Sequence, residues 1–175
     1  LDGIKVEEIC TRVADKVGGV LFPCVYWGAF NTMNFPFTFH FSKRCLKKTT
    51  KEIAKQLSTM GFKVIVLLTG HYPAGQIKQV RKVAKRITRK NNGTIALGIP
   101  EQAVVADLGY TGDHAAKWET SLNMALRPGT VKLEDIPEGL DFAQRCIRHG
   151  IMGKDPTEEA SKELGEKMLG VIVQK

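Results

Sequence analysis

Apolar residues recur at helical spacing in five stretches of the chain. In the first, Ile9, Val13 and Val17 lie four positions apart and form one apolar stripe, which predicts an amphipathic helix over residues 4–17. The pair Gly18–Gly19 is expected to end that helix. The same spacing predicts further helices over residues 42–60, 76–90, 115–126 and 157–173.

Shorter apolar runs between these helices have the character of strands. Residues 63–68 (KVIVLL) form a continuous apolar run, which is typical of a parallel strand that is covered on both faces. Residues 94–98 predict a second strand. Residues 20–26 predict another, although Pro23 restricts it to an edge or a strand end. Residues 103–107 are compatible with either a strand or a helix.

Turn-forming and polar residues mark where these elements begin and end. Ser42 and Thr157 are candidate N-caps, because a hydroxyl oxygen can accept from the first backbone N–H groups of a helix. Residues 27–38 contain Asn, Gly and Pro without a helical period and are expected to form a long loop that lines a pocket. Residues 133–152 are expected to be irregular.

Strands and helices alternate along the chain, with connections long enough for crossovers. This order indicates an α/β fold, a three-layer α/β/α sandwich with a mostly parallel central sheet. The 175 residues suffice for one buried core, so we expect residues 1–175 to form a single domain. The chain starts at Leu1 in what reads as the interior of a fold, and we therefore expect that an N-terminal strand precedes it.

The composition is that of a globular protein in the cytoplasm. Hydrophobic residues make up 43% and charged residues 25% of the chain, and no apolar run approaches the length needed to span a membrane. There is no C-x-x-C pair, and no secretory signal is visible in these residues. We therefore expect the four cysteines to be reduced and mostly buried: Cys10, Cys24, Cys45 and Cys146.

Positive charge is concentrated in one part of the chain. Residues 43–90 contain fourteen Lys or Arg and one acidic residue, Glu52, whereas residues 91–175 contain nine basic and thirteen acidic residues. Such asymmetry is compatible with a polyanionic partner or with solvated helix faces. Because aromatic residues are not interleaved with the basic residues of 76–90, we do not expect nucleic-acid binding.

Two polar clusters lie where an α/β fold places its sites. His71 follows the apolar strand, and sites in parallel sheets lie beyond the carboxyl ends of strands. In residues 112–121 (GDHAAKWETS), His114 lies at a predicted helix start, Glu119 lies further into the helix, and Asp113 can cap it. An imidazole and a carboxylate this close can bind a divalent metal or share proton transfer; a capped helix with a solvated glutamate is the alternative.

The second cluster belongs to a longer run that resembles a family signature. DHAAKWETS, followed by residues 124–128 (MALRP) and Val131, is similar to the HAGxxETS…L.P.LV signature of the creatininase (creatinine amidohydrolase) family. Weaker similarities extend over nearly the whole chain. The loop 69–72 (TGHY) resembles the family's NGH loop, and residues 35–36 (FP) resemble its FPGT stretch. Residues 153–156 (GKDP) and 163–165 (ELG) resemble its C-terminal tail, and Asp2 resembles the Asp of its TD element.

The resemblance implies a metal-dependent amidohydrolase that cleaves a C–N amide bond of a small cyclic or linear amide and assembles as a hexamer. It also implies two Zn or Mn ions, which would polarise the carbonyl group and activate a bridging water. Transferred to this chain, Asp2 is the bridging carboxylate and His71 is a metal ligand. His114 assists proton transfer, and Glu119 is a catalytic carboxylate or a metal ligand.

The chain departs from the family pattern at several ligand positions. The family's Glu-x-His element, which precedes the Asp and supplies ligands, is absent from this sequence. Pro73 stands where creatininase itself has a further Glu ligand, and Phe37 replaces a loop glycine. Because tight binding of a metal needs about three protein ligands, we expect weak metal binding and no measurable amidohydrolase activity from these 175 residues alone.

Two classes of function therefore remain. The chain is a metal-dependent amidohydrolase if the intact protein supplies the missing N-terminal ligands, or it is an inactive family member that serves as a binding or assembly protein. A Glu-x-His element upstream of Leu1 would distinguish the two. We expect a homo-oligomer in either case, because aromatic residues are dense in the loop region: Trp27, Phe30, Phe35, Phe37 and Phe39.

Overall fold

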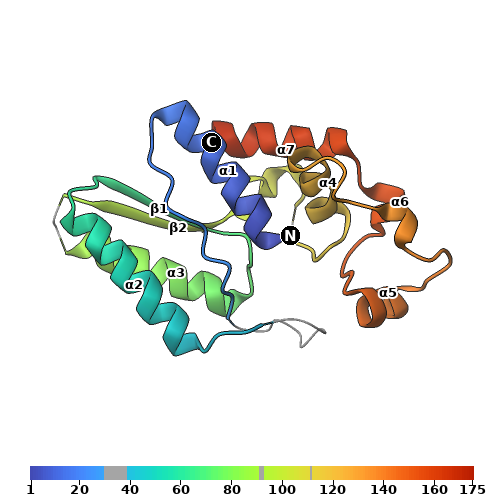
Figure 1. Ribbon diagram of the computed structural model, residues 1–175, viewed down its shortest axis with the longest axis horizontal. Helices are drawn as coiled ribbons and strands as arrows, with labels where there is room; N and C mark the ends of the chain where they lie inside the picture. The colour runs from blue at the N-terminus through green and yellow to red at the C-terminus, as the bar shows by residue number, and fades with distance from the viewer. Residues whose placement is uncertain (30–38, 91–92, 111) are drawn as a thin grey trace. The chain divides into compact units, whose positions relative to one another are not determined.

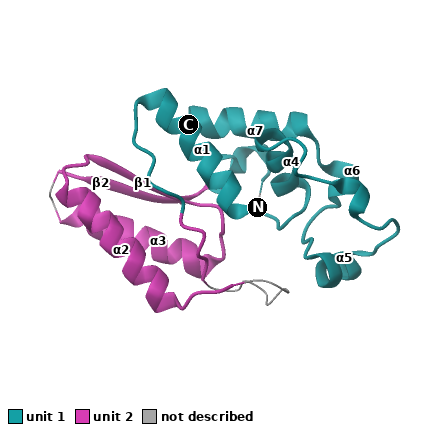
Figure 2. Cartoon of the chain, in the orientation of Figure 1, with its two compact units in different colours: residues 1–24, 102–175 teal, residues 25–101 magenta. Residues whose placement is uncertain are grey.

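A computed structural model describes residues 1–29, 39–90, 93–110 and 112–175 of the chain (Figure 1). The chain forms two compact units (Figure 2). The first unit comprises residues 1–24 and 102–175, and the second comprises residues 25–101. The expectation of a single domain over residues 1–175 stays a prediction.

The second unit is a β–α–β arrangement with one additional helix. Strands β1 (Val64–Thr69) and β2 (Ile95–Pro100) pair in parallel, with Val64 opposite Ile95. Helix α3 (Ala74–Arg89) connects them, and α2 (Lys43–Thr59) precedes β1. The α/β class and the parallel pairing expected from the sequence are thus confirmed. The core between helices and sheet consists of Ala54, Ile65, Val83 and Ile87, with Leu57, Phe62, Leu67 and Ala96 packed against it.

Helix α3 lies directly on the backbone of β2. A Cβ atom at Gly98 would lie 2.9 Å from the carbonyl carbon and oxygen of Val80, so only glycine allows this approach. The opposite face of the sheet differs from the expectation that both faces of the apolar strand are covered. Four apolar side chains on that face are exposed to solvent: Val64, Val66, Ile95 and Leu97.

The first unit consists of helices. Its main elements are α1 (Asp2–Val17), α4 (Lys117–Leu126) and α7 (Lys162–Gln174), and α4 and α7 pack closely against each other (Figure 1). Its buried apolar side chains include Ile9 of α1, Leu122 of α4 and Met168, Leu169 and Ile172 of α7. The remaining elements are short: α5 (Phe142–His149), α6 (Pro156–Glu159) and the 3-10 turns η2 (Ala106–Leu108) and η3 (Leu133–Asp135). A further 3-10 turn, η1 (Glu101–Val104), begins at the last residue of the second unit.

Several predicted boundaries are confirmed by their capping geometry. Gly18 ends α1 in the left-handed conformation with φ 72°. Ser42 caps α2, because its hydroxyl oxygen accepts from the backbone N of Cys45 at 3.1 Å. The open choice at residues 103–107 is resolved as two 3-10 turns.

Three predictions of secondary structure are wrong. Residues 20–26 carry no strand, in keeping with Pro23, which cannot donate to a ladder. The helix predicted over 157–173 is two helices: Asp155, not Thr157, caps α6, and Ser161 caps α7 by accepting from Leu164 N at 3.1 Å. The stretch expected to be irregular contains α5.

Two expectations drawn from composition can be compared with the structure. All four cysteines are free, as expected for reduced thiols, and each is half-buried. No helix among the described residues is both long enough and apolar enough to cross a bilayer. Location in the cytoplasm stays a prediction.

Candidate functional site

The segment that leads into α4 is held by two backbone hydrogen bonds of His114. His114 N donates to Met152 O at 3.0 Å, and Met152 N donates to His114 O at 2.7 Å. The next residue, Ala115, has φ 49°, which is unusual for a residue with a Cβ atom. Gly153 packs against this segment, because a Cβ atom there would lie 2.8 Å from Cβ of Ala116. In the GKDP segment of the C-terminal region, Gly153 therefore packs against the DHAAKWETS run.

Asp113 fixes the first turn of α4, as its predicted capping role requires. Its two carboxylate oxygens accept from the backbone N of Trp118 at 2.7 Å and of Glu119 at 3.1 Å. Burial raises the pKa of this carboxyl group to about 6, partly opposed by the hydrogen bond from Trp118. The cap thus sets the position of the Glu119 backbone.

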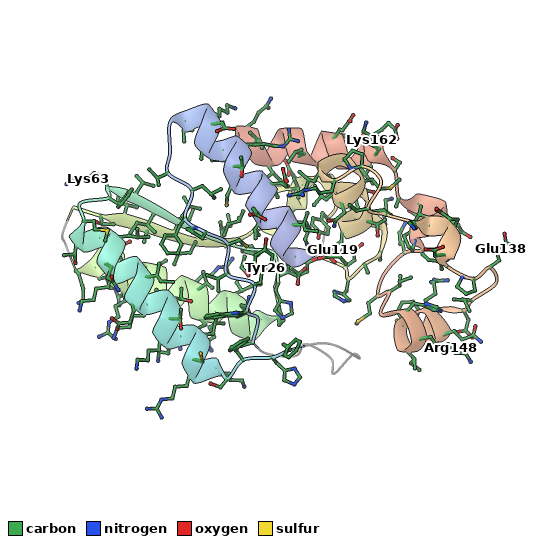
Figure 3. The ribbon with its side chains drawn as sticks, in the orientation of Figure 1. Tyr26, Lys63, Glu119, Glu138, Arg148 and Lys162 are labelled. Atoms are coloured by element: carbon green, nitrogen blue, oxygen red, sulfur yellow. The ribbon has the colours of Figure 1, made fainter. Side chains whose placement is uncertain are left out.

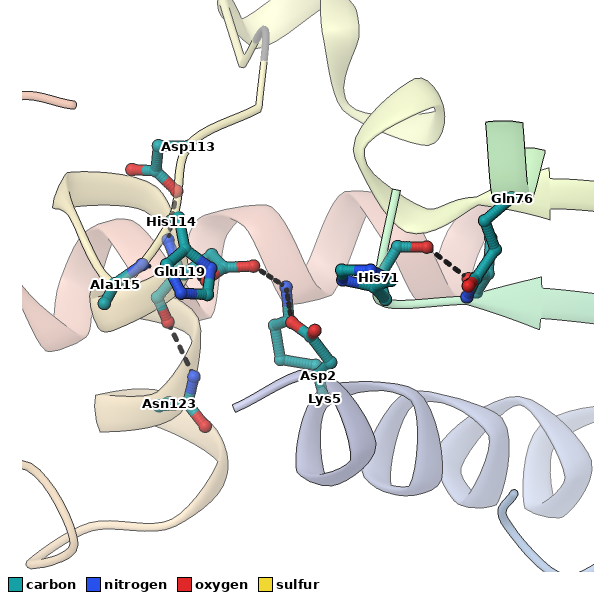
Figure 4. Close-up of polar contacts among 10 residues, drawn as sticks. Asp2, Lys5, His71, Gln76, Asp113, His114, Ala115, Glu119 and Asn123 are labelled. Carbon is teal, nitrogen blue, oxygen red and sulfur yellow. Dashed lines mark hydrogen bonds and ion pairs between the residues drawn. The ribbon is translucent and has the colours of Figure 1, made fainter. Parts of the chain in front are cut away.

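Glu119 is buried and paired with a lysine of α1. Its side chain is 1% exposed, and Oε1 accepts a hydrogen bond from Nζ of Lys5, which is 0% exposed (Figure 4). Oε2 accepts from the backbone N of Ala115 at 2.9 Å. In Figure 3, Glu119 is labelled among the helices of the first unit. Because both oxygens have a protein donor, the carboxylate is held in one orientation.

Asp2 and His114 lie on either side of this buried pair. Asp2 Oδ1 is 3.7 Å from Nζ of Lys5, and the Asp2 side chain is 31% exposed. Nδ1 of His114 is 3.8 Å from Oε2 of Glu119, which is a charge contact when the imidazole is protonated. The His114 side chain is 40% exposed, so water and solutes can reach it. Three of the four predicted site residues therefore lie in the first unit, where Asp2 and Glu119 contact Lys5 and His114 contacts Glu119.

His71, the fourth predicted site residue, belongs to the second unit. It follows β1, and its backbone oxygen accepts from the hydroxyl of Thr69. Gln76 donates to the same hydroxyl at 3.0 Å and accepts from the backbone N of Ala29 at 3.0 Å, which orders the turn. Gly28 lies against the ring, since a Cβ atom there would be 3.2 Å from Cδ2 of His71. The family resemblance places His71 and His114 in one cleft, and this stays a prediction.

Lys5 is the site residue that sequence reasoning did not identify. The signal was present, because Lys5 continues the apolar stripe of Ile9, Val13 and Val17 backwards by four positions. A charged residue on an apolar stripe has to find a partner when it is buried. In the structure that partner is Glu119, 114 positions further along the chain.

The donor set around Lys5 does not suit a divalent metal. Both oxygens of Glu119 already accept from protein donors, and a lysine ammonium group lies beside Asp2. Within the parts of the chain that the structure describes, no group of three or more His, Cys, Asp or Glu side chains is placed to hold a metal ion. The Asp2, His71 and Glu119 ligand set that the resemblance implies stays a prediction.

The basic residues of the second unit form a solvated helix face. The buried side of α3 consists of Gln76, Val80, Val83, Ala84 and Ile87. The opposite side is exposed, and a shallow hollow there is lined by Ala74, Ile77, Lys78, Arg81, Lys82 and Lys85. This geometry favours the interpretation of the charge concentration as a solvated face.

Comparison with known proteins assigns the fold and the family. A family model described as creatinine amidohydrolase matches residues 1–175. The chain belongs to the creatininase family. A creatinine amidohydrolase of Pseudomonas putida, another creatininase-family protein, is 26% identical over 207 residues, covering 99% of this chain and 78% of the relative.

Solved creatininase structures share the fold of this family member. A mutant creatininase of the Zn–Zn type superposes with a TM-score of 0.71 at 23% identity, and the alignment covers 95% of this chain and 76% of the other. A creatininase with Mn gives a TM-score of 0.72 at the same identity and coverage. At this identity the likeness shows the fold, and the metals named belong to those proteins.

Proposed function

We propose that the protein hydrolyses the C–N amide bond of a small cyclic or linear amide. Membership of the creatininase family suggests amidohydrolase activity. The observation that carries the proposal is the pairing of an accessible imidazole, His114, with a buried carboxylate, Glu119, at the N-terminal end of α4. The best match to the family signature falls on the same residues.

This arrangement can supply the proton transfers that amide hydrolysis needs. A proton must leave the attacking water and reach the departing nitrogen. An imidazole can accept the proton from the water and donate it to the nitrogen. His114 is accessible enough to touch a substrate, and we assign it as the catalytic residue. Glu119 is almost completely buried, and its Oε2 lies 3.8 Å from Nδ1 of His114, so it acts through His114 as a positioning residue.

A divalent metal such as Zn²⁺ or Mn²⁺ is the cofactor that the resemblance implies. When bound, it would polarise the amide carbonyl and lower the pKa of a bound water. Since the residues around Lys5 do not fit such an ion, no step of the proposed chemistry goes through a metal. Metal dependence of the protein stays a prediction that dialysis against a chelator can check.

The test is turnover by the intact protein of creatinine and of simple lactams, with and without added Mn²⁺ or Zn²⁺. His114→Gln should lower kcat by about a hundredfold or more, the range expected for a lost general acid–base. His149→Gln is the matched control, because His149 is exposed at the end of α5. Absence of turnover on every small amide would overturn the proposal and favour a non-catalytic role. The same assay on residues 1–175 alone checks the expectation that they lack activity.

We further propose that the protein assembles as a homo-oligomer of an even number of chains, a hexamer by resemblance. Trp27 and Phe39 are exposed, and Trp27 stacks on Phe41 with ring centroids 5.0 Å apart. The other aromatic residues of the loop, Phe30, Phe35 and Phe37, and most of the loop expected to line the pocket, lie outside the described residues. Light scattering at micromolar concentration should show the oligomer, and a monomer would contradict it.

A further inference from the structure

The first unit contains a fully buried lysine with a carboxylate on either side. Nζ of Lys5 donates to Oε1 of Glu119 and lies 3.7 Å from Oδ1 of Asp2. Lysine is almost never fully buried unless it is paired, because removing its charge from water is costly. Here the cost is offset by two negative groups that come from different elements, the start of α1 and the first turn of α4.

We propose that Lys5 is the resident cation of this site. Its ammonium group occupies the position between Asp2 and Glu119 that a divalent metal ion would take, and it holds the Glu119 side chain in one orientation behind His114. Lys5 is thus a positioning residue, and this pair of carboxylates binds no metal while Lys5 is present.

Competition for the same position follows from the donor geometry. A zinc ion binds carboxylate oxygens at about 2.0–2.2 Å, so an ion that bridges Asp2 and Glu119 must lie close to where the ammonium group lies. A divalent ion and an ammonium group would repel each other at that separation. The metal could enter only if Lys5 moved, and a moved Lys5 would lose its buried partner.

The other contacts of Glu119 hold it in place without a metal. Its Oε2 accepts from Ala115 N at 2.9 Å, and its backbone N is fixed by the Asp113 carboxylate at 3.1 Å. Its backbone oxygen accepts from Nδ2 of Asn123 at 2.8 Å. These contacts fix both the side chain and the backbone of Glu119, and the ammonium group of Lys5 supplies the opposite charge that a buried carboxylate needs.

The test measures Mn²⁺ binding by equilibrium dialysis in the absence of substrate, so its outcome does not depend on the proposed amidohydrolase activity. Mn²⁺ is chosen because it prefers oxygen ligands over the thiols of the chain. The proteins compared are wild type, Asp2→Asn, Lys5→Arg, Lys5→Met and the double variant Lys5→Met with Asp2→Asn.

Wild type, Asp2→Asn and Lys5→Arg should all bind Mn²⁺ with the same affinity. In all three proteins a cation already fills the position, and in Asp2→Asn one carboxylate ligand is also gone. Lys5→Met should raise the Mn²⁺ association constant by about tenfold or more, and the double variant should lose that gain. A tenfold weaker affinity of Asp2→Asn than of wild type would overturn the proposal. A folded Lys5→Met protein without any gain would overturn it as well.

A second measurement keeps the proposal falsifiable if Lys5→Met fails to fold. In wild type, the buried ammonium group of Lys5 should give a side-chain ¹⁵N–¹H correlation that is protected from exchange with water. The correlation should disappear in Lys5→Arg. A spectrum without any protected lysine ammonium signal would show that Lys5 does not occupy the position between the two carboxylates.

Discussion

Gly165 of α7 lies against the backbone of Ser121 in α4, so closely that a Cβ atom at position 165 would be 1.9 Å from the Ser121 carbonyl oxygen. The contact is reinforced by a hydrogen bond from the backbone N of Ser161 to Oγ of Ser121 at 3.0 Å. The two helices therefore meet backbone to backbone. This packing explains why the ELG segment of the C-terminal region is small at its last position.

Replacement of Gly165 by alanine should destabilise the protein by about 1–3 kcal/mol or more, because the added methyl group would force α7 away from α4. The measurement is the free energy of unfolding in urea. Gly170→Ala is the matched control in the same helix, since nothing lies within 4 Å of a Cβ atom there. That substitution should be neutral or stabilising by up to about 1 kcal/mol. Equal effects of the two substitutions would contradict the packing described.

The Lys5–Glu119 pair should be strongly coupled in stability. Lys5→Met or Glu119→Gln alone leaves one buried group without its partner, and each should cost about 3–5 kcal/mol. The double variant should cost much less than the sum, because no uncompensated charge remains. A double-mutant cycle measured by urea unfolding gives the coupling. Additive effects would indicate that the two groups do not form an ion pair.

Asp113→Ala should cost about 1–2 kcal/mol of stability, because two backbone N–H groups in the first turn of α4 lose their acceptor. Asp113→Asn should cost less, since the amide oxygen can still accept one of them. Circular dichroism during thermal unfolding can rank the three proteins. A lower stability of Asp113→Asn than of Asp113→Ala would argue against the capping role.

Alkaline pH should weaken the fold through Cys10. Burial, with a smaller effect of the neighbouring Cys24, raises the pKa of the Cys10 thiol from 9.0 to about 11. Between these values the unfolded chain loses the proton and the folded chain keeps it, so the contribution is complete below pH 9 and is lost as the pH rises towards 11. The stability of wild type relative to Cys10→Ala should therefore fall over this range. A difference that stays constant from pH 8 to pH 11 would contradict this.

Much of the fold could be predicted from local patterns. The stripes of α1, α2 and α3, the apolar run of β1 and the caps at Gly18 and Ser42 depend on neighbours in the sequence, and they are found as expected. Helix α5 was missed although Asp141 and Gln144 form a capping box, because the helix is only 8 residues long. The break before α7 depends on Ser161 reaching Ser121, a contact that no local pattern reveals.

The candidate site was predictable only in part. Asp2, His114 and Glu119 could be identified by their resemblance to the creatininase signature. The role of Lys5 could not be identified that way, because it depends on a partner 114 positions away. The position of Lys5 on the apolar stripe of α1 indicated that it is buried, but burial alone does not identify the residue with which it pairs.

The division of the first unit into two separate chain segments has a consequence for the order of folding. Residues 25–101 are continuous, and β1, α3 and β2 can associate as soon as they are synthesised. Helix α1 leaves the ribosome early, but α4 and α7 follow only after the whole second unit, and closure of so long a loop carries an entropic cost. We therefore expect the second unit to acquire protection from hydrogen exchange first during refolding. Lys5 would remain in water until α4 arrives, so its burial is one of the last steps by which the chain becomes native.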